Sequence, residues 1–349
     1  MRKPKALQIN NIGSPQKQLL ILTLRLHINY RMKKLLLFPL LAFSMFLFAQ
    51  TANLPTDQKL LKTDKAINFI AMGDFGRNGE YSQKEVALQM GKTAKEFDAG
   101  FFVITGDNFY PHGVASTQDY SWQASFEQIY TAHSLQKDWY VVLGNHDYAG
   151  NVQAEIDYSK ISRRWHMPAR YYAKKMSING DTSQQVLFVF IDTSPFITSY
   201  YNNEDSEVRT QDTTAQKQWI ENVLSDASPN IKWKIVVGHH PLYTGGPRIN
   251  GADTKIMNAS FKTVFDKYKV DAYIYGHEHN LQYIKPAGST HYFISGSGSE
   301  LTPAVKHPDG GKFAISQNGF MAFSITNNLM VVQIINKDGQ VLYADTIKK

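Results

Sequence analysis

Short apolar runs that end at glycine are the feature of this sequence that most limits its fold. The runs are rich in β-branched and aromatic residues, and most lead directly into Gly and a polar cluster. Continuous apolar runs of this length are typical of strands that are buried on both faces. We therefore predict strands at residues 67–73, 100–106, 139–144, 186–192, 233–238, 271–276 and 291–296.

Segments with helical periodicity separate several of these runs. They cover residues 82–97, 115–130, 152–165, 214–227 and 259–268. Strands that alternate with helices indicate an α/β fold with much parallel pairing. The C-terminal runs "FMAFSI", "MVVQIIN" and "QVLYADTI" are joined by short polar links, which predicts an antiparallel meander. We expect one sheet packed on another with helices outside, and a mobile surface loop at the polar stretch 200–214.

The basic excess of the chain lies at its N-terminus. The formal net charge is +7, yet residues 1–49 hold eight Lys and Arg and no acidic residue, which leaves 29 basic against 30 acidic residues elsewhere. The charge therefore gives no indication of a nucleic-acid-binding surface on the folded domain. Because the chain has no cysteine, any metal site must be built from His, Asp, Glu, Asn or Tyr.

The N-terminal region has the pattern of an export signal. Residues 32–49 begin Met-Lys-Lys, continue as an apolar run and end at Ala49, where a signal peptidase could cut. The run is shorter than the roughly 20 residues of a membrane span, so we expect a periplasmic or secreted protein with no stable span after cleavage. An uncleaved N-terminal anchor is the alternative. We divide the chain into a leader of doubtful origin (1–31), a signal peptide (32–49), a linker (50–65) and one domain (66–349).

Metal-competent side chains follow five of the predicted strands. Ligands of α/β sheets bind beyond the carboxyl ends of strands, so these side chains are expected to meet. One Gly-Asp or one His at a strand end is usually a turn or a hydrogen-bonded core residue, but five such ends form a consistent set. In chain order the set is Asp74, Asp107, Tyr110, Asn145, His146, His239, His277 and His279.

The donor types of this set indicate the metals. Carboxylate, imidazole, amide oxygen and phenolate suit iron, manganese or zinc. Without His146 the set has seven ligands, more than one catalytic ion with an open position requires, so it indicates two ions bridged by a carboxylate. The neighbouring residues Asp147, His240 and Glu278 are expected to fix loops rather than bind metal.

The order of the motifs resembles one family. The blocks "GDFG", "GDNFY", "GNHD", "VVGHHP" and "GHEH" match the five-block signature of purple acid phosphatases, within the metallophosphoesterase superfamily. The segments "GNVQAEIDYSKISRRWHMPARYY" and "HNLQYI" look like the small tartrate-resistant acid phosphatases of animals. The resemblance covers nearly all of residues 66–349. It implies an α/β fold in four layers (αββα), a β-sandwich of two mixed sheets flanked by helices.

The resemblance also implies a ligand set and an activity. Fe(III) would be held by Asp74, Tyr110 and His279, a divalent Fe, Zn or Mn by Asn145, His239 and His277, and Asp107 would bridge the two. In this family a tyrosinate stabilises Fe(III) and gives the protein its colour. The implied enzyme is an acid phosphatase, a phosphoric monoester hydrolase in which a metal-activated hydroxide attacks the phosphate monoester in line.

Three residues are candidates for direct contact with the substrate. His146 follows the ligand Asn145, and its imidazolium would bind a phosphoryl oxygen or protonate the leaving group. Animal relatives carry a second substrate-facing histidine where this chain has Arg248, which can bind phosphate but cannot supply a proton. His112 is either a substitute proton donor or an ordinary loop residue.

Other functions fit the same residues. A phosphodiesterase or nucleotide pyrophosphatase could use the same dimetal site, and a non-catalytic protein could bind phosphate or metal there. A ferric–ferrous pair could also react with peroxide. We expect a monomer that acts on a small-molecule or phosphoprotein monoester and does not bind nucleic acid.

Overall fold

The computed structural model describes residues 60–204, 206–302 and 307–349. The leader, the signal peptide and all but the end of the predicted linker lie outside the described residues. Within the described ranges, no helix has the length and apolar character needed to cross a membrane.

Two mixed sheets of seven strands form the centre of the domain. The first has the strand order β14-β13-β12-β1-β2-β3-β4, in which β1 to β4 run parallel and β12 to β14 form an antiparallel meander. Its strands are β1 (Ile67–Met72), β2 (Phe101–Ile104), β3 (Asp138–Val141), β4 (Trp165–His166), β12 (Gly319–Ile325), β13 (Leu329–Asn336) and β14 (Val341–Lys348).

The second sheet has the strand order β11-β9-β10-β8-β7-β6-β5. Parallel pairing joins β6, β7, β8 and β10, and antiparallel strands lie at both edges. Its strands are β5 (Tyr172–Ile178), β6 (Asp181–Phe190), β7 (Ile231–Val237), β8 (Ala272–Tyr275), β9 (Leu281–Ile284), β10 (His291–Ser295) and β11 (Gly311–Ile315).

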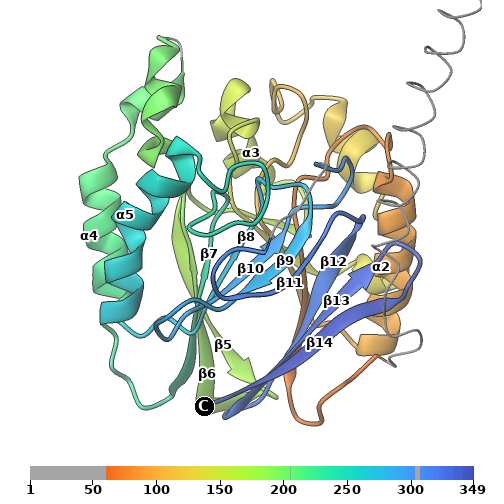
Figure 1. Ribbon diagram of the computed structural model, residues 1–349. Helices are drawn as coiled ribbons and strands as arrows, with labels where there is room; N and C mark the ends of the chain where they lie inside the picture. The colour runs from red at the N-terminus through yellow and green to blue at the C-terminus, as the bar shows by residue number, and fades with distance from the viewer. Residues whose placement is uncertain (1–59, 205, 303–306) are drawn as a thin grey trace, which may run out of the picture. The chain divides into compact units, whose positions relative to one another are not determined.

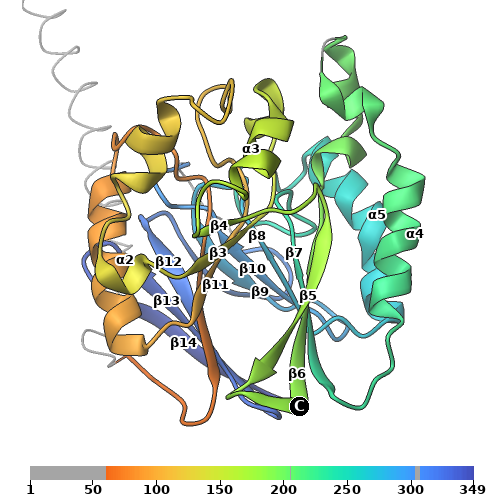
Figure 2. The same cartoon turned by 180° about the vertical axis from the view of Figure 1, so that it is seen from behind.

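The sheets pack face to face and helices cover their outer faces. Phe69 of β1 meets Phe188 of β6 edge to face at 5.4 Å between ring centroids, so side chains of both sheets share one core. Helix α2 (Gln83–Phe97) flanks the first sheet, and α4 (Thr213–Leu224) and α5 (Ala252–Lys267) lie side by side along the second (Figures 1 and 2). The predicted α/β sandwich in four layers is confirmed.

All seven predicted strands and the C-terminal meander are present. The strands that the sequence pattern missed are short or lie at sheet edges. Strand β5, "YAKKMSI", has three consecutive exposed residues and so lacks a continuous apolar run. Edge strands of this kind pair through the backbone with little demand on side-chain polarity.

Three predicted helices are wrong in extent. The helix predicted at 259–268 is the C-terminal part of α5, which begins at Ala252. Residues 115–130 contain turns and a π-helix at Trp122–Glu127 instead of a long α-helix. The Asp119 carboxylate accepts the backbone N–H groups of Ala115 and Ser121, each at 2.8 Å, and such local bonds compete with the helix ladder. The helix predicted at 152–165 is α3 (Val152–Tyr158), and β4 follows it.

The polar stretch 200–214 is more structured than the predicted loop. It contains most of one 3₁₀-helix at Thr198–Asn202 and all of a second at Glu207–Thr210, and α4 begins at Thr213. Arg209 Nη1 donates to the Tyr201 carbonyl at 2.6 Å, which joins the two short helices. The mobility of this stretch stays a prediction.

The aromatic stack at the sheet interface gives a stability prediction. Phe69 is fully buried and stacks between Phe101 and Phe323, at 5.1 and 4.9 Å. Replacement Phe69→Ala leaves a cavity between the sheets and is expected to lower the free energy of unfolding by about 3–5 kcal/mol. Tyr120→Ala, at a side chain 73% exposed, should change it by less than about 0.5 kcal/mol. Chemical denaturation measures both, and similar losses in the two variants would contradict this role for Phe69.

Candidate metal centre

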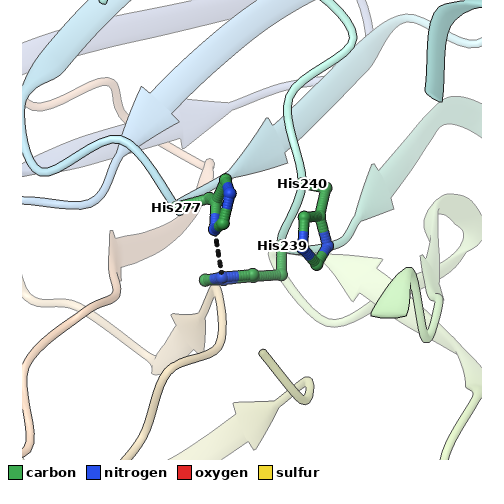
Figure 3. Close-up of side chains that lie close together, drawn as sticks. All are labelled: His239, His240 and His277. Atoms are coloured by element: carbon green, nitrogen blue, oxygen red, sulfur yellow. Dashed lines mark hydrogen bonds between the residues drawn. The ribbon is translucent and has the colours of Figure 1, made fainter. Parts of the chain in front are cut away.

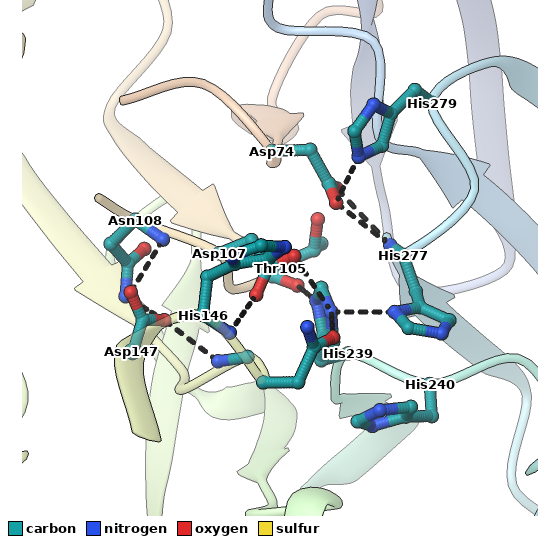
Figure 4. Close-up of polar contacts among 12 residues, drawn as sticks. Asp74, Thr105, Asp107, Asn108, His146, Asp147, His239, His240, His277 and His279 are labelled. Atoms are coloured by element: carbon teal, nitrogen blue, oxygen red, sulfur yellow. Dashed lines mark hydrogen bonds and ion pairs between the residues drawn. The ribbon is translucent and has the colours of Figure 1, made fainter. Parts of the chain in front are cut away.

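Loops from both sheets bring the seven sequence-predicted ligands into one cluster. Figure 4 shows five of them: Asp74, Asp107, His239, His277 and His279. The carboxyl ends of β1, β2 and β3 approach from the first sheet, and those of β7 and β8 approach from the second. Asp74 and His239 are fully buried, and Asp107 is 2% exposed. The donor atoms form two groups, each described below.

The first group surrounds the Tyr110 hydroxyl. Tyr110 Oη lies 3.2 Å from Asp74 Oδ1, 2.9 Å from Asp107 Oδ2 and 3.1 Å from His279 Nε2. His279 Nε2 and Asp74 Oδ1 are 3.5 Å apart. Four donor atoms from three loops therefore face one small volume.

The second group surrounds His239 Nε2. This nitrogen lies 3.2 Å from Asn145 Oδ1, 3.1 Å from His277 Nδ1 and 3.4 Å from Asp107 Oδ2. Asp107 Oδ2 belongs to both groups, so one carboxylate oxygen joins them.

These contacts are those of a site that needs a cation. The Nδ1 of His239 lies 2.8 Å from the Thr105 carbonyl and donates to it, so Nε2 of the neutral ring carries a lone pair. That lone pair faces amide and carboxylate oxygens, which repel it. Burial opposes protonation of His239, but its hydrogen bonds and the charges of Asp107 and Asp74 raise its pKa, so that without metal a proton on Nε2 takes the place of the cation. Metal–nitrogen bonds of about 2.1 Å place neighbouring donors roughly 3.0–3.4 Å apart, which matches the observed spacing. The donor set fits two metal ions.

Glycine before the ligands makes room for the carboxylates. A Cβ on Gly144, before Asn145, would lie 2.2 Å from Asp107 Oδ1, and a Cβ on Gly276 would lie 2.3 Å from Asp74 Oδ2. The backbone is also strained here: Asp74, Asp107 and His277 have φ of 57°, 49° and 69°. Such conformations cost energy in residues with a side chain and persist where surrounding structure enforces them.

Burial shifts the protonation of the cluster in the absence of metal. It raises the pKa of Asp74 well above the usual range, with the Asp107 charge adding to the effect. Burial also opposes ionisation of Asp107, but His239 and His146 together outweigh it and hold the Asp107 pKa below its usual range. Burial lowers the pKa of His279 to about 4. Neutral imidazole beside carboxylate is the form that binds metals.

His240 is close to His239 and His277 but has other partners (Figure 3). Its Nδ1 lies 2.8 Å from Thr193 Oγ1, and its Nε2 lies 2.8 Å from Tyr200 Oη. Both ring nitrogens are thus engaged, and His240 fixes loops as the sequence predicts. Glu278 also serves a loop, because its Oε1 accepts the backbone N–H of Arg248 at 2.9 Å.

A pair of buried acids lies behind the cluster. Asp147 accepts the backbone N–H groups of Gly144 and Asn108, both at 2.8 Å, which supports its predicted loop-fixing role. The Asn108 amide donates to Asp147 at 3.1 Å and to Glu155 at 3.0 Å. Both acids are fully buried, and burial raises the pKa of Glu155 to about 8.

The three predicted substrate-contacting residues lie in different settings. His146 borders the cluster: its backbone N–H donates to Asp107 at 2.8 Å, and its ring lies 4.4 Å from the Tyr110 ring. Arg248 Nη1 donates to the His277 carbonyl at 3.2 Å, and its side chain is 38% exposed. His112 is exposed, and in the described part of the chain its side chain makes no hydrogen bond to the cluster.

Comparison with known proteins identifies the family. The calcineurin-like phosphoesterase family matches residues 67–281. Purple acid phosphatase 4 of Arabidopsis thaliana is 37% identical over 308 residues, with 85% of this chain and 88% of the relative covered. The chain belongs to the purple acid phosphatase family. Tartrate-resistant acid phosphatase type 5 of Homo sapiens is 32% identical over 80% of this chain and 90% of its own length. The expected family and the expected class of enzyme, an acid phosphatase, are confirmed.

Solved structures share the fold of this purple acid phosphatase. GAP50, described as the anchor in the inner membrane complex of Plasmodium, superposes with a TM-score of 0.70 at 23% identity and covers 81% of this chain and 89% of its own. The purple acid phosphatase of yellow lupin seeds gives a TM-score of 0.62 at 17% identity, with 84% of this chain and 55% of that chain covered.

One residue beside the cluster was missed from the sequence. Arg77 places its guanidinium carbon 3.8 Å from the centre of the Tyr110 ring. Its place three residues after Asp74, in "GDFGRNG", was the available signal, but a single arginine in a polar turn has no specificity by itself.

The buried acid pair gives a prediction about pH. The pKa of Glu155 is near 8 when folded and near 4.3 when unfolded, so the folded protein binds more protons between these values. Ionisation of Glu155 therefore makes the free energy of unfolding fall as pH rises from about 5 to 8. Glu155→Gln keeps an acceptor for Asn108 and should make the melting temperature less dependent on pH across this range. Glu96→Gln, on an exposed face of α2, is the control; equal pH dependence in wild type and Glu155→Gln would refute the assignment.

Proposed function

We propose that the chain is an exported acid phosphatase that hydrolyses phosphate monoesters at a dinuclear Fe(III)–M(II) centre. The observation that carries the proposal is the pair of donor groups joined by Asp107 Oδ2, one of them containing a phenol oxygen. The proposed ferric ligands are Asp74, Tyr110 and His279, the proposed divalent-metal ligands are Asn145, His239 and His277, and Asp107 bridges. The divalent metal is Fe, Zn or Mn.

When bound, the proposed metals would supply a nucleophile by lowering the pKa of water and would neutralise the phosphoryl oxygens. The protein residues hold and orient the reactants. His146 lies beside the cluster with Nδ1 2.7 Å from the Pro111 carbonyl. A proton on Nδ1 is donated to that carbonyl, so Nε2 is the atom that binds a phosphoryl oxygen or protonates the leaving group.

Arg248 is proposed to bind the phosphate group. Its Nη1 uses one hydrogen on the His277 carbonyl, and the Glu278 carboxylate lies 3.5 Å away. A guanidinium has five N–H donors, so others stay free for an anion. Arginine cannot lose a proton at physiological pH and therefore cannot act as the acid. His112 is exposed, and its side chain makes no hydrogen bond to the described residues, which supports the alternative of an ordinary loop residue.

Export and the other partner assignments remain parts of the proposal. The signal-peptide pattern of residues 32–49 in the sequence supports a periplasmic or secreted location. The balanced charge of residues 50–349 supports the absence of nucleic-acid binding. We propose that the protein acts as a monomer.

The colour of the metal-loaded protein tests the assignment of Tyr110 as a ferric ligand. The metal-loaded protein should absorb visible light through charge transfer from Tyr110 to Fe(III), and Tyr110→Phe should lose the band entirely and retain less iron. Tyr283→Phe, whose hydroxyl bonds His291 at 2.8 Å, is the control and should keep the band. The measurements are a visible spectrum and metal analysis. A colourless wild type that is fully active with zinc in both positions would contradict the ferric assignment.

His146 and Arg248 should affect different kinetic parameters. His146→Ala is expected to lower kcat for a monoester by about 10²–10⁴-fold and to remove the decline of kcat at high pH, since a general acid must be protonated. Arg248→Met should raise KM and the inhibition constant of inorganic phosphate roughly tenfold, through loss of charge-assisted hydrogen bonds. Arg248→Lys should restore part of this. Equal changes in both parameters for both variants would contradict the division of roles.

Assays at pH 5 with a monoester and a diester separate the phosphatase from the alternatives. Faster turnover of the diester would replace the proposal with a phosphodiesterase. Tight phosphate binding by the metal-loaded protein, without turnover of either substrate, would indicate a binding protein.

A further inference from the structure

Arg77 contacts the face of the phenol that we assign to Fe(III). Its guanidinium carbon lies 3.8 Å from the centroid of the buried Tyr110 ring and 5.1 Å from that of Tyr81, whose side chain is 61% exposed. The guanidinium is thus shared between two tyrosine rings. A cation at this distance from a ring face is attracted by the ring's negative face, and burial strengthens the attraction.

The loop that carries Arg77 is held in place by its backbone. Gln83, fully buried at the start of α2, accepts the N–H groups of Arg77 at 3.2 Å and Gly79 at 2.7 Å. Ser125 Oγ accepts the N–H of Asn78 at 2.9 Å. These bonds fix the backbone of the loop that carries Arg77. The backbone, and not only the side-chain conformation, therefore places Arg77 near the Tyr110 ring.

A second loop supplies a counter-charge. Glu300 Oε2 lies 2.5 Å from Arg77 Nη2, and the two side chains are 38% and 17% exposed. The Glu300 loop is docked on the Asp74 loop: Ser299 Oγ donates to the Asp74 carbonyl at 2.7 Å, and the Gly298 N–H donates to the Gly73 carbonyl at 3.1 Å. The Gly-rich segment 295–299 therefore holds Glu300 beside Arg77.

The guanidinium keeps one donor unused. Arg77 Nε is buried and has no hydrogen-bond partner among the described residues. Buried donors of this kind normally have a partner. Here the guanidinium carbon lies over the Tyr110 ring while Nε makes no hydrogen bond to the described residues.

We propose that Arg77 is a positioning residue that acts through Tyr110, and that the Arg77–Glu300 pair sets how strongly the phenolate donates to Fe(III). The inference rests on the proposed ferric site. The positive charge of Arg77 acts mainly on the Tyr110 ring, because the guanidinium lies over the ring. A metal held through Oη would lie beyond the edge of the ring. The charge stabilises the phenolate electrons, which raises the energy of charge transfer to iron. It also weakens donation, which favours the ferrous state and raises the reduction potential. Glu300 partly cancels both effects.

Variants of the two partners should shift the spectrum in opposite directions. Arg77→Met removes the cation and should move the visible band to longer wavelength and lower the iron reduction potential. Glu300→Gln leaves the cation less neutralised and should move the band to shorter wavelength and raise the potential. Arg77→Lys keeps the charge and should lie between wild type and Arg77→Met. The measurements are the visible spectrum and a redox titration of metal-loaded protein with equal iron content.

The outcomes separate this inference from the function on which it rests. A wild-type protein without a visible band overturns both. A coloured wild type whose band and potential are unchanged in Arg77→Met and Glu300→Gln overturns only the role of Arg77. Shifts in the same direction in both variants also overturn it, because they indicate a general loosening of the site. If Arg77→Met fails to retain iron, Arg77→Lys and Glu300→Gln still test the sign of the effect.

Discussion

The mutual repulsion of buried acceptor atoms is the constraint on which this structure depends. His239 Nε2 faces the Asn145 amide oxygen and the Asp107 carboxylate, while its other nitrogen is committed to the Thr105 carbonyl. The buried carboxylate of Asp74 lies close by in the Tyr110 group. Burying such groups without compensation is costly. The proposed pair of cations would remove that cost.

The sandwich holds these atoms together because both sheets contribute to the cluster. The His239–Thr105 contact joins the end of β7 to the end of β2, across the two sheets. Ser295 Oγ, at the end of β10, donates to the Ala71 carbonyl of β1 at 2.8 Å and forms a second link. A shift of one sheet against the other would move His239, His277 and His279 away from the donor atoms of the first sheet and so disrupt both groups. The packing of the core thus bears directly on the geometry of the centre.

Local patterns explain how much of this could be predicted from the sequence. Apolar runs followed by Gly marked the strand ends, and Gly144 and Gly276 show why: a Cβ there would collide with carboxylate oxygens of Asp107 and Asp74. The polar edge strand β5 and the turns at residues 115–130 escaped prediction because backbone pairing and the Asp119 carboxylate decide them. The role of Arg77 could not be predicted because its partners, Tyr110 and Glu300, are distant in sequence. Only the fold brings the three residues together.

The two arginines beside the cluster share a pattern but differ in exposure. Each lies near a glutamate, Arg77 near Glu300 and Arg248 near Glu278, and each adjoins a different donor group. Arg77 is 17% exposed and lies against a ring, so its charge acts on a ligand that is already in place. Arg248 is 38% exposed and has N–H groups to spare, so its charge is available to an incoming anion. In the proposed centre, an arginine side chain would thus tune one metal site and bind substrate at the other, and the difference in burial would decide which role each arginine has.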